Sequence, residues 1–390
     1  MSAQDESRSR TIPRPGAGVQ ERPEGDGAGD RPAPARAVGL MSGGLDSTLA
    51  ARVLHEQGLD VVGLYFNTGF CTYDHRRAIA RKEEDPRRLR HHALQAGAEA
   101  QVEIRVIDVA DEYLEMVKHP KHGYGAAANP CIDCRIFMLN KAREVADQEG
   151  ADIVFTGEVL GQRPMSQHRN ALDLIEKETG LKGRLLRPLS AGHLQPTRAE
   201  RSGAVDRTRL LSIKGRSRRE QARIAEELEI EEYPQPSGGC CFLADRGFGR
   251  RFHDLIREEE TPGRKVTRDE IMLLKVGRHF RLTSRVKAIV GRDEAENNFM
   301  ERFRAGRWRL AARDHLGPVT LLTGDPGAGE VELSAAITAR YCDGRGEEQV
   351  VVLAERYDAM TGPGGPPAEG RELTVRPAAD ETLAPLRIGL

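Results

Sequence analysis

The 390-residue sequence lacks the features that mark several broad protein classes. No stretch approaches the roughly 18 consecutive apolar residues of a membrane span, and no charged-then-apolar leader opens the chain. Because 59 Lys and Arg residues balance 60 Asp and Glu residues, a uniformly basic nucleic-acid-binding surface is excluded. Six cysteines are too few for a disulfide scaffold. We therefore expect a cytoplasmic protein with reduced thiols and no membrane partner.

Several common catalytic signatures are also missing. No Gly-Lys-Ser/Thr follows the glycine-rich loop, so this is not a Walker loop and cleavage at a γ-phosphate is not expected. No Gly-x-Ser-x-Gly motif indicates a serine hydrolase. The eleven histidines show no HxxxH or HxxE spacing, so a histidine metal site is not predicted.

The most informative stretch is 37–58, where an apolar strand pattern meets a Ser/Gly corner and then a helical pattern. Adjacent glycines let an anion approach the backbone, and a helix N-terminus offers unpaired N–H groups and a positive dipole. Aspartate at this corner suits a magnesium ion that bridges phosphate oxygens. The predicted pyrophosphate loop consists of Ser42, Gly43, Gly44, Asp46 and Ser47.

Strand and helix patterns alternate after this loop. Apolar strands are expected at 60–66, 102–109 and 153–157, with a helical pattern at 85–97. This rhythm predicts an α/β fold with a doubly wound parallel sheet, and a nucleotide at the carboxyl ends of its strands.

Two cysteine segments follow. Cys131 and Cys134 open a predicted helix over 131–150, so both thiols project from one side of a helix N-terminus. Cys240 and Cys241 lie on a glycine-lined loop, and neighbours in extended chain point in opposite directions, so one of them joins the pair. We favour Cys240 and leave the role of Cys241 open. Three thiolates suit a [4Fe–4S] cluster with one open iron; four would suit zinc, and metal-free persulfide chemistry is a further alternative.

Together these motifs resemble the PP-loop ATP pyrophosphatase superfamily, and within it the tRNA thiolation branch of 2-thiouridylases and 4-thiouridine synthases. The resemblance spans about 38–243 and rests on SGGLDS at 42–47, NPCIDC at 129–134 and the GGC at 238–240. It implies an adenine nucleotide alpha hydrolase-like fold that uses ATP and Mg²⁺. It also implies tRNA as the partner, and a sulfur donor protein or sulfide. Carried over by position, the loop residues would bind ATP, Gly157 would border the nucleotide, and sulfur would be handled by Cys131, Cys134 and Cys240.

The activity that this resemblance implies is an ATP-dependent tRNA sulfurtransferase. ATP would adenylate a uridine carbonyl oxygen and release pyrophosphate, and sulfur would then displace AMP. Two alternatives stay open: a PP-loop enzyme that adenylates or thiolates a small molecule, and a nucleotide-binding regulator without turnover. The sequence does not determine the uridine, the sulfur donor or the number of subunits.

Composition divides the chain into four segments: a disordered tail (1–36), the catalytic domain (37–245), a smaller α+β module (246–358) and a linker-like tail (359–390). Within the module, 331–339 alternates like a strand. Short segments at 276–280 and 291–297 resemble RNA-associated NFACT-like modules. Basic residues between 207 and 219, and at 76–92, either contact RNA phosphates or form solvated faces.

Overall fold

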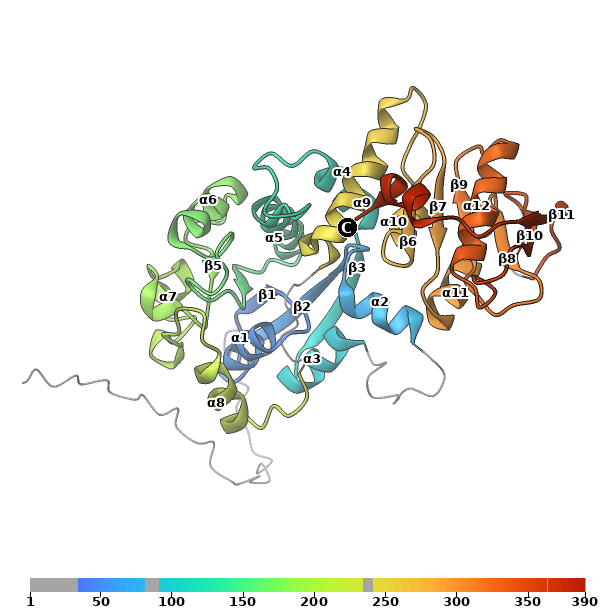
Figure 1. Cartoon of the computed structure of the whole chain (residues 1–390). Helices are drawn as coiled ribbons and strands as arrows, with labels where there is room; N and C mark the ends of the chain where they lie inside the picture. The colour runs from blue at the N-terminus through green and yellow to red at the C-terminus, as the bar shows by residue number, and fades with distance from the viewer. Residues whose placement is uncertain (1–33, 81–90, 234–240, 363, 390) are drawn as a thin grey trace, which may run out of the picture.

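The computed structural model describes residues 34–80, 91–233, 241–362 and 364–389. Nearly all of the predicted disordered tail lies outside these residues. The first sheet contains β1 (Arg36–Leu40), β2 (Asp60–Asn67), β3 (Glu103–Asp108), β4 (Ile153–Thr156) and β5 (Leu185–Leu186). All its strands are parallel, in the order β3-β2-β1-β4-β5, with β1 between β2 and β4 (Figure 1). The predicted doubly wound sheet is confirmed.

Helices cover both faces of this sheet. One face packs against α1 (Leu45–His55), α3 (His92–Ala100) and α8 (Arg219–Glu227). The other face packs against α4 (Ala110–Lys118), α5 (Cys131–Gln148), α6 (Arg169–Thr179) and α9 (Arg246–Ile256). Two further helices in this part of the chain are the short α7 (Arg198–Ser202) and α2 (Thr72–Ile79), and α2 lies toward the second sheet (Figure 1). Because both faces are covered, the strands read as nearly continuous apolar runs.

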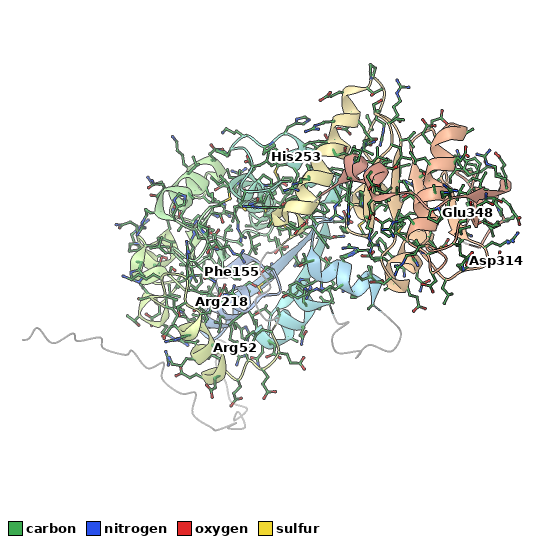
Figure 2. The ribbon with its side chains drawn as sticks, viewed as in Figure 1. Arg52, Phe155, Arg218, His253, Asp314 and Glu348 are labelled. Carbon is green, nitrogen blue, oxygen red and sulfur yellow. The ribbon has the colours of Figure 1, made fainter. Side chains whose placement is uncertain are left out.

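The second sheet has seven strands in the order β11-β10-β8-β9-β7-β6-β12. All of its strand pairs are antiparallel. Its strands are β6 (Arg278–Arg281), β7 (Lys287–Val290), β8 (Trp308–Ala312), β9 (Thr320–Thr323), β10 (Val350–Arg356), β11 (Glu369–Val375) and β12 (Arg387–Ile388). The accompanying helices are α11 (Glu294–Glu301), α12 (Ala328–Arg340) and α13 (Asp380–Leu383). Asp314 and Glu348 mark the outer part of this module in Figure 2. The predicted α+β module is confirmed.

Two details of the C-terminal prediction are wrong. The segment 331–339 lies within helix α12, because its buried residues Val331, Ser334, Ala335 and Thr338 follow helical spacing. The supposed linker-like tail at 359–390 contains β11 and β12, which form the two edges of the second sheet. The sequence did not predict these strands because the segment starts with a Pro/Gly-rich run, and the first strand begins only at Glu369.

The predicted boundary at 245 does not match the packing. Phe248 and Phe252 of α9 lie in the core beneath the first sheet. Helix α10 (Arg268–Leu273) contributes Ile271 to that core, whereas its Leu273 packs in a cluster with strands of the second sheet. The segment that joins the two sheets therefore belongs to both cores.

None of the helices in the described ranges combines the length and apolar composition that crossing a membrane requires.

Strand β1 has one position where only glycine fits. A Cβ on Gly39 would lie 2.1 Å from Cζ of Phe155, whose ring fills the space beneath the strand and is fully buried. The close pairing of β1 with β4 thus depends on glycine at position 39, which has no side chain.

We expect Gly39→Ala to lower the free energy of unfolding by about 1–3 kcal/mol, because the buried Phe155 ring must shift. Urea denaturation followed by far-UV circular dichroism measures this. Gly346→Ala is the matched control, since no atom lies within 4 Å of its added Cβ. An unfolding midpoint equal to that of the wild type would contradict the role given to Phe155.

Candidate functional site

The predicted pyrophosphate loop links the end of β1 to the start of α1. Gly43 has a φ of 74°, and a Cβ there would lie 2.1 Å from the His92 ring, so glycine is required. The Ser47 hydroxyl donates to the Gly44 carbonyl (2.8 Å) and lies 3.2 Å from the Ser42 hydroxyl. No side chain caps the α1 N-terminus at Gly44. The loop therefore presents hydroxyl groups beside an uncapped helix N-terminus, which suits an anion.

Asp46 occupies the first turn of α1 and has one unused oxygen. Its Oδ2 accepts a hydrogen bond from Gln162 Nε2 (2.9 Å) and lies 3.5 Å from a guanidinium nitrogen of Arg218, which Figure 2 labels. Its Oδ1 is buried and has no hydrogen-bond partner among the described residues. An unpartnered carboxylate oxygen beside a phosphate-type loop fits a magnesium ion.

Gly157 brings the end of β4 against this loop. A Cβ at this position would lie 2.5 Å from the Asp46 carbonyl carbon and from the Ser47 backbone nitrogen. Gly157 also lines a cavity together with Ser42, Asp46 and Ser47. The structure thus brings together Gly157 and three of the loop residues, and their binding of a nucleotide stays a prediction.

The same cavity contains thiols from three segments of the chain. It is lined by Cys131 and Cys134 at the N-terminus of α5, by Cys71 after β2, and by Cys241 before α9. The predicted approach of the CxxC pair to the nucleotide loop is therefore present in the geometry. Cys240 lies outside the described residues, so its predicted role stays a prediction. Cys241, whose role the sequence left open, lines the cavity.

Asn129 precedes α5 but does not cap it. Pro130 is the N-cap residue, and no side chain caps this helix. The Asn129 amide instead donates to the Cys131 sulfur (3.2 Å) and to the Met165 sulfur (3.4 Å). Asn129 thus contacts one of the two thiols of the motif.

The described cysteines do not by themselves form a metal site. Among the residues that the structure describes, no group of three or more His, Cys, Asp or Glu side chains could hold a metal ion. The [4Fe–4S] set of Cys131, Cys134 and Cys240 includes a residue outside that part of the chain. The described thiols alone therefore do not fit a cluster.

Charged residues at the cavity divide into paired and unpaired groups. Glu158, which lines the cavity, pairs with Arg187 (3.0 Å), and Arg187 is 2% exposed and also pairs with Glu176, so these charges form a structural ion pair. Glu158 also lies 3.4 Å from Arg135. Arg163 lines the cavity and has no ion pair among the described residues. Arg163 is thus a cation that is available to a phosphate.

A second cavity of about 400 Å³ adjoins the first, and both are lined by Tyr65 and Thr68. Its wall from α10 includes Met272 and, two residues after that helix, Lys275. Lys275 is 6% exposed and forms no ion pair among the described residues; it donates to the Met272 sulfur (3.0 Å). Burial lowers the pKa of Lys275 to about 8. A buried ammonium therefore lies beside the candidate site.

The basic cluster at 207–219 has two parts. Arg207 pairs with Glu200, and Arg209 donates to the Glu56 carbonyl (2.9 Å), so both hold the fold together. Lys214 and Arg216 are exposed and form no ion pair in the described ranges. This loop continues to Arg218, which lies 3.5 Å from Asp46. The unpaired charges of Lys214 and Arg216 therefore lie near the predicted pyrophosphate loop.

Sequence reasoning missed Cys71 and Arg163. Cys71 stands four residues after β2, and parallel strands end at one edge of a sheet, so the position after the second strand was a usable signal. Arg163 belongs to an irregular segment after β4, and no local pattern indicates where its side chain lies.

Comparisons with known proteins agree with the two modules. Residues 33–193 match the family model described as thiamine biosynthesis protein (ThiI). Residues 277–383 match the one described as NFACT protein RNA binding domain.

Curated relatives are tRNA-specific 2-thiouridylases named MnmA. The protein from Petrotoga mobilis is 32% identical over 130 residues, 31% of this chain and 34% of the relative. The protein from Bordetella pertussis is 27% identical over 236 residues, 58% of each chain. The chain thus spans about a third to somewhat over half of the length of these relatives.

Among solved structures, a predicted subunit of tRNA methyltransferase from Methanocaldococcus jannaschii is similar over 50% of this chain and 76% of its own, with 15% identity and a TM-score of 0.29. A TM-score this low carries no conclusion about function. The first module, with its parallel sheet, is thus similar to the ThiI kind of PP-loop domain, a family that uses ATP and Mg²⁺, and the second module is similar to an NFACT-type RNA-binding domain.

Proposed function

We propose that the protein is an ATP-dependent tRNA sulfurtransferase that adenylates a uridine carbonyl oxygen and replaces it with sulfur. One observation carries the proposal: the cavity that holds Ser42, Asp46 and Ser47 also holds the thiols of Cys71, Cys131, Cys134 and Cys241. Nucleotide activation needs the first group, and sulfur transfer needs the second. The similarity to tRNA-specific 2-thiouridylases supports tRNA as the acceptor.

The chemistry gives each group a task. A uracil carbonyl oxygen is a poor leaving group and AMP is a good one, so adenylation divides a difficult substitution into two feasible steps. The loop N–H groups and hydroxyls of Ser42 and Ser47 hold the phosphates, and Arg163 offsets charge that develops at them. Asp46 would hold Mg²⁺, which neutralises charge on the departing pyrophosphate when it is bound.

Buried apolar residues limit access of water to the adenylate. Leu40, Met41, Leu64 and Phe66 line the cavity, and each is less than 8% exposed. A dry wall of this kind protects an activated carbonyl from hydrolysis until sulfur arrives.

The RNA would approach from two sides of this cavity. The exposed Lys214 and Arg216 lie in the loop that leads to Arg218 at the nucleotide site. The NFACT-type module is joined to the neighbouring cavity through α10. Cations in both places can contact phosphates without specifying a sequence.

The proposal predicts pyrophosphate release that requires both ATP and tRNA, together with a thiolated uridine in the product. The full chain is incubated with ATP, Mg²⁺, tRNA and sulfide, and nucleosides from the digested tRNA are examined by mass spectrometry. Pyrophosphate release with a small-molecule acceptor and without tRNA would support the small-molecule alternative. No pyrophosphate release under any of these conditions would support the regulator alternative.

Asp46→Asn is expected to reduce tRNA-dependent pyrophosphate release by at least about 100-fold, because the neutral amide no longer favours a cation at the phosphates. The isosteric change keeps the contact with Gln162 within reach, so the melting temperature should stay near that of the wild type. Asp325→Asn, at an exposed position outside the site, is the control. Equal rates in the two variants would remove Asp46 from the mechanism.

Lys214→Ala combined with Arg216→Ala is expected to weaken tRNA binding and to lower the slope of log affinity against log salt by about 0.7–0.9 for each lost phosphate contact. Fluorescence anisotropy over a salt series measures this slope. Arg223→Ala is the control, because Arg223 is already neutralised by Glu220 (2.8 Å) and Glu227. A slope unchanged in the double variant would place the RNA elsewhere.

A further inference from the structure

A separate cavity of about 350 Å³ lies at the β5 edge of the first sheet. Its walls come from α6, from β5 and from the segment 191–201, which includes most of α7. Among the residues that the structure describes, it shares no lining residue with the nucleotide cavity. Its elements lie at the end of the first module that is farther from the second sheet (Figure 1). The proposed function does not use this cavity.

A buried guanidinium with one unused nitrogen forms part of the cavity wall. Arg187 lines the cavity, and its side chain is 1% exposed. Its Nε donates to Glu158 (3.0 Å) and its Nη1 donates to Glu176, so these two bonds fix the plane of the group. Its Nη2 is buried and has no hydrogen-bond partner in the described ranges. Because a buried donor without a partner costs free energy, this nitrogen indicates a place for an acceptor on a ligand.

The other charges of the lining are mostly positive. Among the lining carboxylates, Glu176 pairs with Arg187 and Glu200 pairs with Arg207, whereas Asp173 has no ion pair with any described residue. Four exposed cations of the lining likewise form no ion pair within the described part of the chain: Arg169, Lys182, Arg198 and Arg201. The cavity therefore has a clear excess of positive charge.

Hydrogen bonds hold the wall between β5 and α7 in place. Arg207 donates to the carbonyls of Ala191 (2.6 Å) and Leu194 (2.9 Å), and the Arg198 N–H donates to the Gly183 carbonyl (2.7 Å). Both residues of β5 line the cavity and are less than 5% exposed. Apolar surroundings strengthen the attraction between opposite charges. The cavity is thus preorganised for an anion.

We propose that this cavity is a binding site for a phosphate monoester. Such a group carries about 1.5 to 2 negative charges at pH 7 and three acceptor oxygens, which match the unused nitrogen of Arg187 and the surrounding excess of cations. Two sources carry this group: the 5′ end of an RNA and a free nucleotide. The inference goes beyond the proposed function, because the site would bind phosphate whether or not the protein transfers sulfur.

Acetylation of Lys182 tests the site directly. The full chain is treated with acetic anhydride at constant ionic strength, with or without inorganic phosphate, and modified lysines are quantified by mass spectrometry. Lys177 is the internal control, since it is also exposed but does not line the cavity. Phosphate at ten times its dissociation constant is expected to slow acetylation of Lys182 about tenfold and to leave Lys177 unchanged. No protection of Lys182, or equal protection by acetate, would overturn the proposal.

Two substitutions at exposed positions should shift this protection in opposite directions. Arg198→Ala is expected to raise the phosphate concentration for half-protection of Lys182 about tenfold, through loss of a charge-assisted hydrogen bond. Asp173→Asn is expected to lower it about twofold, because a repelling carboxylate is removed. Arg250→Ala is the control, since Arg250 is exposed and lies outside the cavity. Equal shifts in the Arg198 and Arg250 variants would overturn the site.

Arg187 itself is a poor target for substitution, because it also holds Glu158 and Glu176 in place. The substitutions at exposed positions avoid this difficulty, and the melting temperature of each should equal that of the wild type.

The source of the phosphate is identified with the same measurement. Stronger protection of Lys182 by tRNA that carries a 5′ phosphate than by the same tRNA after phosphatase treatment would assign the site to an RNA end. Protection by AMP, with no effect of the RNA 5′ phosphate, would assign it to a free nucleotide. Protection by inorganic phosphate alone would overturn the monoester assignment. Loss of thiolation activity in a separate assay would leave each of these results standing.

Discussion

The contact between the end of β4 and the start of α1 is the constraint on which the site depends. Gly157 lies against the backbone of Asp46 and Ser47, where any side chain would collide. This contact requires β1 to pair with β4 in register, Leu40 opposite Thr156, and that pairing in turn requires Gly39 above the Phe155 ring. Two glycines thus permit two strands and one helix to meet at the point where a nucleotide would bind.

The thiols reach this point by three different routes. Cys71 follows β2, Cys131 and Cys134 lie at the start of α5, and Cys241 lies in the segment that joins the modules. Their convergence is a property of the tertiary fold, since parallel strands end at one edge and deliver their connecting segments there. The joining segment is fastened to the turn after β2 by a β-bridge between Cys241 and Cys71. The meeting of these thiols in one cavity therefore depends on the docking of α9 on the first sheet.

Local patterns predicted the first module well. The alternation of apolar strands and helices, and the Ser/Gly corner at 42–47, define the sheet and its loop without tertiary information. The helix at α12 was missed because small residues such as Ala335 and Thr338 carry no strong period. Cys71 was missed because Cys241, its partner in the β-bridge, is distant in sequence. Long-range pairing is what a single sequence conceals.

Helix α10 has fewer than two turns and yet contributes side chains to two hydrophobic cores. Ile271 packs beneath the first sheet, and Leu273 packs with the second sheet. Met272 and Lys275 meanwhile form part of the wall of the cavity that adjoins the candidate site. A helix that is so short and so closely packed moves as a rigid unit and does not bend. A shift of the second module against the first would therefore also move Met272 and Lys275, and with them the wall of the cavity that Tyr65 lines.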